Sequence, residues 1–148
     1  MTSSLETHLG YWLRFVSNHV SHAFSLKLQA HDVTVAEWVV LRQLFDADGI
    51  PPSALADRLG MTRGAISKLA DRLIAKKYIA RMVSTADRRQ QALSLTSAGR
   101  ALVPKLSALA DRNDAEFFGD LKPAERAALE KTLKDIVRRH DLKTTPTK

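Results

Sequence analysis

The sequence predicts a mainly helical fold of six helices with one small β-hairpin. Over most of the chain, apolar residues recur every three or four positions, which is the period of an amphipathic helix. Residues 78–83 and 90–95 are short extended stretches on either side of a polar segment, and they predict the hairpin. The charge is also localised, because residues 51–100 hold ten Lys and Arg against three Asp and Glu. We therefore expect a compact basic module on a near-neutral helical support.

The first helix is predicted over about residues 4–29, where no Pro interrupts the helical spacing. Its apolar positions are Leu5, Leu9, Trp12, Leu13, Val16, Val20, Phe24 and Leu28. Thr34 and Glu37 have the spacing of a capping box, in which each side chain accepts a hydrogen bond from the other residue's backbone N–H, and this predicts a second helix. A third helix is predicted near residues 52–59, with Pro52 in its first turn.

Residues 52–77 have the spacing of a helix-turn-helix. Two helices that cross at about 90–120° need a small residue where their backbones approach, and Ala56 supplies it. Gly60 allows a positive φ at the turn, and Thr62 is suited to cap a fourth helix that continues to about Lys77. The inner faces of both helices are apolar at Leu55, Leu59, Met61, Ile66 and Leu69.

The outer face of the fourth helix combines small and cationic side chains, which suits a helix that binds DNA. Small residues let a helix enter a major groove about 12 Å wide, where Arg and Lys reach base edges or phosphates. We expect DNA contacts from Thr62, Arg63, Gly64, Ser67, Lys68 and Arg72. Lys76 and Lys77, at the helix end, are expected to contact phosphates alone. The alternative is an ordinary solvated helix face.

The polar segment of the hairpin contains Asp87, Arg88 and Arg89, and we expect it to act as a wing, a hairpin that contacts DNA beside the helix. An arginine on a projecting hairpin can enter the minor groove, where narrow A·T-rich stretches concentrate negative potential. Asp87 lies two positions before Arg89 and is suited to hold its guanidinium by bidentate hydrogen bonds. The alternative is a solvated turn with a surface ion pair.

The remaining helices indicate a dimer. Thr96 is expected to cap a fifth helix, and a last helix is predicted over about residues 123–140. Like the first helix, both carry apolar stripes that a winged module of about 40 residues cannot cover alone, so a symmetric partner is expected. The expected division is a helical dimerisation region at residues 1–32 and 97–142, a winged helix-turn-helix DNA-binding domain at 33–96, and a disordered tail at 143–148.

Several short motifs in the middle of the chain follow the order and spacing of a known family. They are Leu55-Ala56, Gly60, Ile66-Ser67, Leu73, Tyr78-Ile79-Ala80-Arg81, Asp87-x-Arg89, Leu95-Thr96 and Gly99. In these motifs the chain resembles the MarR family of bacterial transcriptional regulators, and the six-helix order matches over about residues 5–140. Tyr78 is a departure, because the family more often has Gly between the fourth (recognition) helix and the first wing strand.

The resemblance implies a homodimer whose recognition helices bind half-sites of a pseudo-palindromic operator, about one helical turn apart. It also implies a repressor that a small anionic aromatic or phenolic effector releases from double-stranded DNA. An aromatic acid needs apolar walls and a fixed positive donor. The residues that offer both are Tyr11, Trp12, Phe15, His19 and His22 on the first helix, with Trp38 and Arg42 on the second. The alternative is that this aromatic stripe belongs to the core.

Composition argues against several other classes of protein. The absence of Cys excludes a disulfide framework, a thiolate zinc site and a thiol redox switch. The sequence shows no secretory signal, and no apolar run approaches the roughly 18 residues that a membrane-spanning helix needs, so a cytoplasmic protein is expected. No phosphate-binding glycine loop and no HExxH motif occur, and His19 and His22 have no carboxylate nearby, so we expect no enzyme, cofactor or metal. The remaining alternative is a winged-helix module for protein contact or RNA binding, without operator specificity.

Overall fold

The computed structural model describes residues 1–83 and 91–143, and within them it confirms the predicted order of six helices and one hairpin. The elements are α1 (Leu9–Leu28), α2 (Val35–Phe45), α3 (Pro52–Leu59), α4 (Arg63–Ala75), β1 (Ile79–Val83), β2 (Gln91–Leu95), α5 (Ser97–Phe118) and α6 (Pro123–Arg139). Short 3-10 turns, η1 (Leu5–Thr7) and η2 (Gln29–His31), flank α1. The predictions for the wing residues Asp87, Arg88 and Arg89, and for the tail after Lys143, lie outside the described residues.

The first helix starts later than predicted, at Leu9 rather than near residue 4. His8 is extended (φ −95°, ψ 125°) and its side chain makes no capping hydrogen bond. The preceding 3-10 turn packs back on the helix, because the indole Nε1 of Trp12 donates to the carbonyl oxygen of Glu6 at 2.8 Å. The apolar spacing of the helix extends back to Leu5, but the α-helical backbone begins only at Leu9.

The predicted helix caps are confirmed. The Thr34 hydroxyl accepts from the backbone N–H of Glu37 (3.1 Å), and the Glu37 carboxylate accepts from the backbone N–H of Thr34 (2.9 Å), which completes the capping box. Thr62 caps α4 by accepting from the backbone N–H of Ala65. Gly60 ends α3 in the left-handed region at φ 64°, a conformation that costs glycine least.

The recognition helix α4 ends at a left-handed residue that the sequence did not identify. Lys77 has φ 67°, its backbone N–H donates to Ile74, and the backbone N–H of Tyr78 donates to Leu73. These two bonds form a Schellman motif, whose left-handed position favours glycine. The prediction that Tyr78 occupies the glycine position was therefore wrong by one residue, because the helix end is defined by these bonds rather than by the start of the strand.

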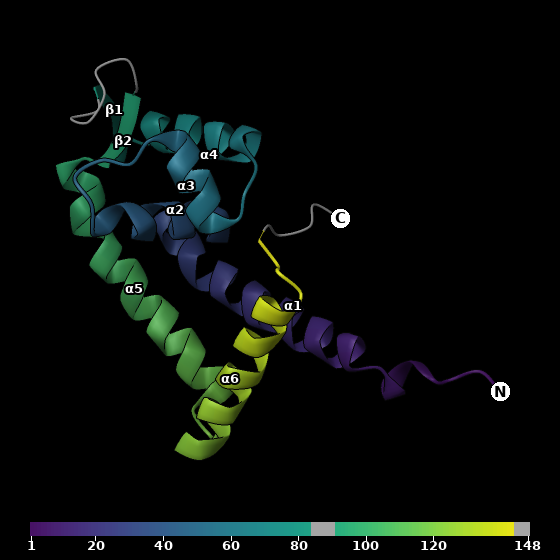
Figure 1. Cartoon of the computed structure of the whole chain (residues 1–148). Coiled ribbons are helices and arrows are strands. Elements are labelled where there is room, and N and C mark those ends of the chain that lie inside the picture. Colours follow the sequence, from purple (N-terminus) through teal and green to yellow (C-terminus); the bar gives the residue numbers. More distant parts are fainter. Residues whose placement is uncertain (84–90, 144–148) are drawn as a thin grey trace.

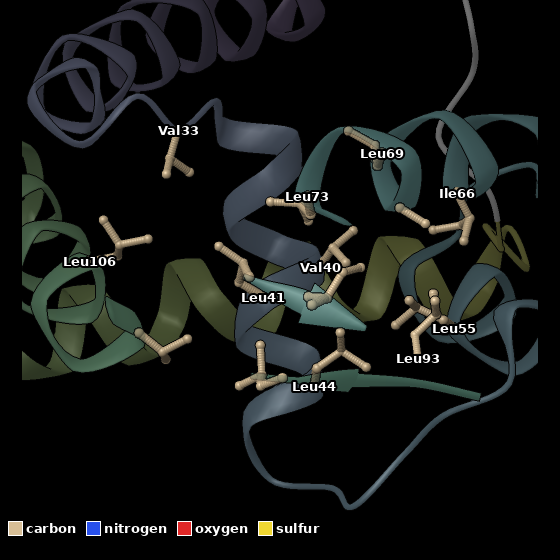
Figure 2. Packing of buried hydrophobic residues seen from close by; sticks show 14 of the residues in the cluster. Val33, Val40, Leu41, Leu44, Leu55, Ile66, Leu69, Leu73, Leu93 and Leu106 are labelled. Atoms are coloured by element: carbon tan, nitrogen blue, oxygen red, sulfur yellow. The ribbon is translucent and has the colours of Figure 1, made fainter. Parts of the chain in front are cut away.

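The core of the winged module is built around α2. Figure 2 shows Val40, Leu41 and Leu44 of α2 in one hydrophobic cluster with Leu73 of α4 and Leu106 of α5. All five of these side chains are buried, which makes α2 the common support of the helix-turn-helix and of α5. The hairpin joins the same core, since β1 and β2 pair antiparallel and Leu93 of β2 exchanges two backbone hydrogen bonds with Ile50.

The helices α1, α5 and α6 form a scaffold that extends away from this module. Figure 1 shows α4 and the hairpin at one end of the molecule and α6 at the far end of α5. A polar contact fixes α1 on α5: the buried side chain of Asn113 donates to the carbonyl of Val20 (3.1 Å) and accepts from Lys27 (3.0 Å). None of the helices in the described ranges is long and apolar enough to cross a membrane.

Candidate nucleic-acid interface

The recognition helix α4 separates its side chains into a buried and an exposed face, as the sequence predicted. Ile66, Leu69, Ala70 and Leu73 are buried against the core. The six residues expected to contact DNA are all exposed: Thr62, Arg63, Gly64, Ser67, Lys68 and Arg72. The structure therefore presents the small and cationic side chains together, on the side of α4 that faces away from the protein.

Gly64 is the one residue of these six that has no side chain. Among the described residues, no heavy atom outside the local helix backbone lies within 4 Å of a Cβ built at Gly64. The protein's own packing thus gives no reason for a glycine here. A missing side chain in the first turn of α4 would instead let another molecule approach the helix backbone closely.

The first wing strand is tied directly to the recognition helix. A guanidinium nitrogen of Arg81 on β1 donates to the carboxylate of Asp71 on α4 at 3.0 Å. Both side chains are largely exposed, so the pair contributes little to stability. The pair places the exposed side of β1 next to the exposed face of α4, so that the two form one surface.

Lys76 does not lie on that surface in the way the sequence suggested. Its ammonium donates to the carbonyl of Asp32 (2.6 Å) and to the carboxylate of Glu37 (3.1 Å), and the Glu37 side chain is fully buried. The expectation that Lys76 contacts phosphates alone is therefore wrong, because its ammonium, although partly exposed, is already bonded to a carboxylate and a carbonyl of the protein. Lys77 is exposed, and the prediction for it stands.

A second candidate site is an apolar groove of about 890 Å³ between α1, α5 and α6. It is lined from α1 by Trp12, Leu13 and Val16 among others, from α5 by Phe117 and Phe118, and from α6 by Leu129 and Leu133. Within the described chain α6 contains no buried residue at all. Sequence reasoning predicted the apolar stripes but not this groove, whose walls come from helices far apart in the sequence.

The residues expected to bind an effector are divided between two places. The rings of Tyr11, Trp12, Phe15 and His19 lie against one another along α1, and those of Phe15 and His19 are stacked with centroids 5.0 Å apart. On α2, Trp38 packs edge-on against Phe24, whereas Arg42 bonds Asp46 at 2.8 Å and lines a separate small pocket. Of this set, Trp12 lines the apolar groove. In one copy of the chain, Arg42 and the aromatic residues of α1 therefore do not share a pocket.

The sequence is similar to a known protein family and to individual transcriptional regulators. Residues 31–90 match the model of the MarR family. The transcriptional regulator SarZ of Staphylococcus haemolyticus is 27% identical over 135 residues, which cover 91% of this chain and 90% of SarZ.

Solved structures share the fold over nearly the whole chain. BpsR of Bordetella bronchiseptica, whose DNA binding is regulated by 6-hydroxynicotinic acid, superposes with a TM-score of 0.83 at 27% identity, over 92% of this chain and 97% of BpsR. A mutant of MarR from Escherichia coli in complex with operator DNA gives a TM-score of 0.82 at 28% identity, over 91% and 99% of the two chains. These similarities confirm the predicted winged-helix fold.

Proposed function

The chain belongs to the MarR family of DNA-binding transcriptional regulators, and we propose that it is a homodimeric repressor that recognises a pseudo-palindromic operator. The observation that carries this proposal is the exposed face of α4. Its small residues, Gly64 and Ser67, lie beside the cations Arg63, Lys68 and Arg72, which is the combination a helix needs to enter a major groove.

The scaffold supports the dimer. The chain exposes 10751 Å² of surface. A compact monomer of 16.4 kDa exposes about 7,500 Å², so one copy leaves a large excess uncovered. Much of the uncovered apolar surface lies on α1 and α6. We propose that residues 1–32 and 97–142 of two copies cover each other's apolar grooves, and that residues 33–96 of each copy bind one half-site.

We further propose that a small anionic aromatic compound releases the DNA. The regulation of BpsR by 6-hydroxynicotinic acid supports an effector of this class. In this chain the aromatic residues of α1 would supply the apolar wall, and His19, stacked on Phe15, would supply the polar donor. Arg42 is less suited to that role, because its guanidinium is bonded to Asp46.

The DNA-binding proposal is tested by selecting bound sites from a random duplex library at about 150 mM salt, where non-specific binding is weak. A two-fold-symmetric motif is the expected result. Arg63→Ala should select a motif that is degenerate at one base of each half-site, whereas Arg112→Ala, an exposed arginine on α5, should select the same motif as the wild type. Binding without an enriched motif, lost as salt rises, would contradict operator recognition and favour the protein-contact function.

The effector proposal is tested with salicylate as the probe. Saturable quenching of tryptophan fluorescence, with a parallel loss of operator affinity, is the expected result. The chain has two tryptophans, so Trp12→Phe and Trp38→Phe separate their signals. The quenching should disappear in Trp12→Phe and persist in Trp38→Phe. Quenching that does not saturate, or that leaves operator affinity unchanged, would refute the site.

A further inference from the structure

The C-terminal end of the recognition helix is where both long scaffold helices meet the winged module. Lys76 and Lys77 follow α4, and Asp32 follows α1 and its 3-10 turn. Asp32 and Lys77 are both left-handed, with φ 54° and 67°. After α1, the backbone N–H of Val33 donates to Leu28 and that of Asp32 donates to Gln29. The N–H groups of Tyr78 and Lys77 make the same pair of bonds after α4, so both helices end in a Schellman motif.

Lys76 joins these two helix ends. Its ammonium donates to the backbone carbonyl of Asp32 at 2.6 Å and to the carboxylate of Glu37 at 3.1 Å, and it lies 3.8 Å from the Asp32 carboxylate. The Glu37 carboxylate is fully buried, and its second oxygen has no hydrogen-bond partner among the described residues. A buried carboxylate needs a counter-charge, so the Lys76 ammonium is held at this point.

The start of α5 is attached to the same helix end from another segment. The Thr96 hydroxyl donates to the carbonyl of Lys77 (2.7 Å) while it caps α5 by accepting from the backbone N–H of Gly99 (3.1 Å). A Cβ at Gly99 would lie 2.1 Å from the carbonyl oxygen of Tyr78, so only glycine permits this approach. Residues 76–78 are thereby fixed to the connection after α1 and to the first turn of α5.

We propose that Lys76 is a positioning residue: through Glu37 and Asp32 it fixes the orientation of α4 relative to the scaffold, and so sets the half-site spacing that the dimer accepts. In the proposed dimer the two recognition helices are connected only by the scaffold. The distance between them therefore depends on how rigidly each helix is attached to the scaffold. The inference rests on the proposed function, since spacing has meaning only for a dimer on two half-sites.

The test measures spacing selectivity by anisotropy titration on three duplexes: the selected operator and versions with one base pair inserted or deleted at its centre. Wild type should bind both altered duplexes at least about tenfold more weakly, because the second half-site is rotated and shifted. Lys76→Met keeps the apolar stem without the charge. It should bind the selected operator more weakly than wild type does. Its affinity for the altered duplexes should be only about threefold below its affinity for the selected operator, and this ratio is the spacing penalty.

Lys77→Met is the matched control, since it removes the neighbouring exposed ammonium by the same substitution. It should weaken binding to all three duplexes equally and lower the salt slope by about one, as loss of a phosphate contact does. Lys76→Met should leave the salt slope unchanged. A Lys76→Met protein that behaves like Lys77→Met overturns the inference, as does one that keeps the full spacing penalty.

The buried Glu37 carboxylate left by Lys76→Met is a risk to folding. The double variant Glu37→Gln with Lys76→Met removes that charge and keeps the capping box, because Gln serves at its third helical position as Glu does. It should unfold at higher denaturant concentration than Lys76→Met and show the same relaxed spacing. If wild type itself fails to bind the operator or to distinguish the spacings, the proposed function fails, and this outcome is separate from failure of the variants.

Discussion

In the winged module, Leu41 and Leu44 of α2 are completely buried, whereas in the scaffold Leu129 and Leu133 of α6 each leave 41% of their surface exposed. The four residues are of the same type and all occur on amphipathic helices. What differs is the number of elements around them, since α2 is enclosed by α3, α4, α5 and the hairpin, and α6 borders an open groove.

This difference separates two kinds of stability. The core of the winged module is complete within one chain, with side chains from α1 and α5 among its members, so we expect its unfolding free energy not to depend on protein concentration. In the proposed dimer the scaffold completes its core only by association, so its stability follows mass action. Each of the following changes tests one side of that division.

The largest effect is expected from Leu133→Asp, which places a carboxylate in the groove. In a symmetric interface the change is buried twice, and we expect association to weaken by about 4 kcal/mol, roughly a thousandfold in dissociation constant. Sedimentation at micromolar concentration should give a monomer with circular dichroism close to that of the wild type.

The control for Leu133→Asp is Ala127→Asp, which puts the same carboxylate on the other side of α6, near Lys131 and Lys134. This variant should remain a dimer. If Leu133→Asp also sediments as a dimer, the groove is not the interface.

Leu44→Ala tests the other side of the division. A buried leucine truncated in a closed core costs about 3 kcal/mol of unfolding free energy. We expect the same cost in the Leu133→Asp background, because the core of the winged module belongs to one chain and the two sites are independent. Chemical denaturation at two protein concentrations measures both values. A cost that depends on the dimer would show that the winged module is not complete by itself.

An intermediate effect is expected from Arg63→Ala on the exposed face of α4. Loss of an arginine that contacts a base should reduce operator affinity by about 1–3 kcal/mol and relax preference at that base. The unfolding free energy should change by less than about 0.5 kcal/mol, since Arg63 is exposed. Anisotropy titrations against the selected operator and single-base variants provide the measurement. If Arg63→Ala weakens binding to every sequence equally, Arg63 contacts a phosphate rather than a base.

The sequence predicted those features whose partners lie close together along the chain. The capping box of Thr34 and Glu37 spans three residues, and the faces of α4 follow from helical periodicity. The contact between Glu37 and Lys76 joins residues 39 apart, and no local pattern indicates it. Lys76 was therefore assigned to the phosphates by its position at the helix end, although tertiary structure had already given its charge a partner.

The residues expected to bind an effector lie in two places in one copy of the chain for a similar reason. Helical spacing places Tyr11, Phe15 and His19 near one another on α1, and the distances between neighbouring ring centroids, 6.0 and 5.0 Å, agree with this. Spacing does not determine how α1 crosses α2, and that crossing brings Trp38 against Phe24 and leaves Arg42 beside Asp46. Which residues of different helices share a pocket is a property of packing.

The smallest effect is expected from Gly64→Ala, and it separates folding from DNA binding most cleanly. Among the described residues nothing obstructs the added methyl group, so the change should stabilise α4 by about 0.5 kcal/mol through helix propensity. The same methyl group would stand on the face of α4 proposed to enter the major groove. Operator affinity should fall by about 1 kcal/mol while the protein becomes more stable.

Gly10→Ala on α1 calibrates the propensity gain, since its Cβ also meets no described atom within 4 Å. Thermal unfolding should rise in both variants, and operator affinity should fall in Gly64→Ala alone. Opposite signs for stability and binding cannot arise from damage to the fold, because damage lowers both. If Gly64→Ala binds the operator as tightly as wild type, the backbone of α4 does not approach DNA closely at Gly64, and the flanking cations must account for recognition.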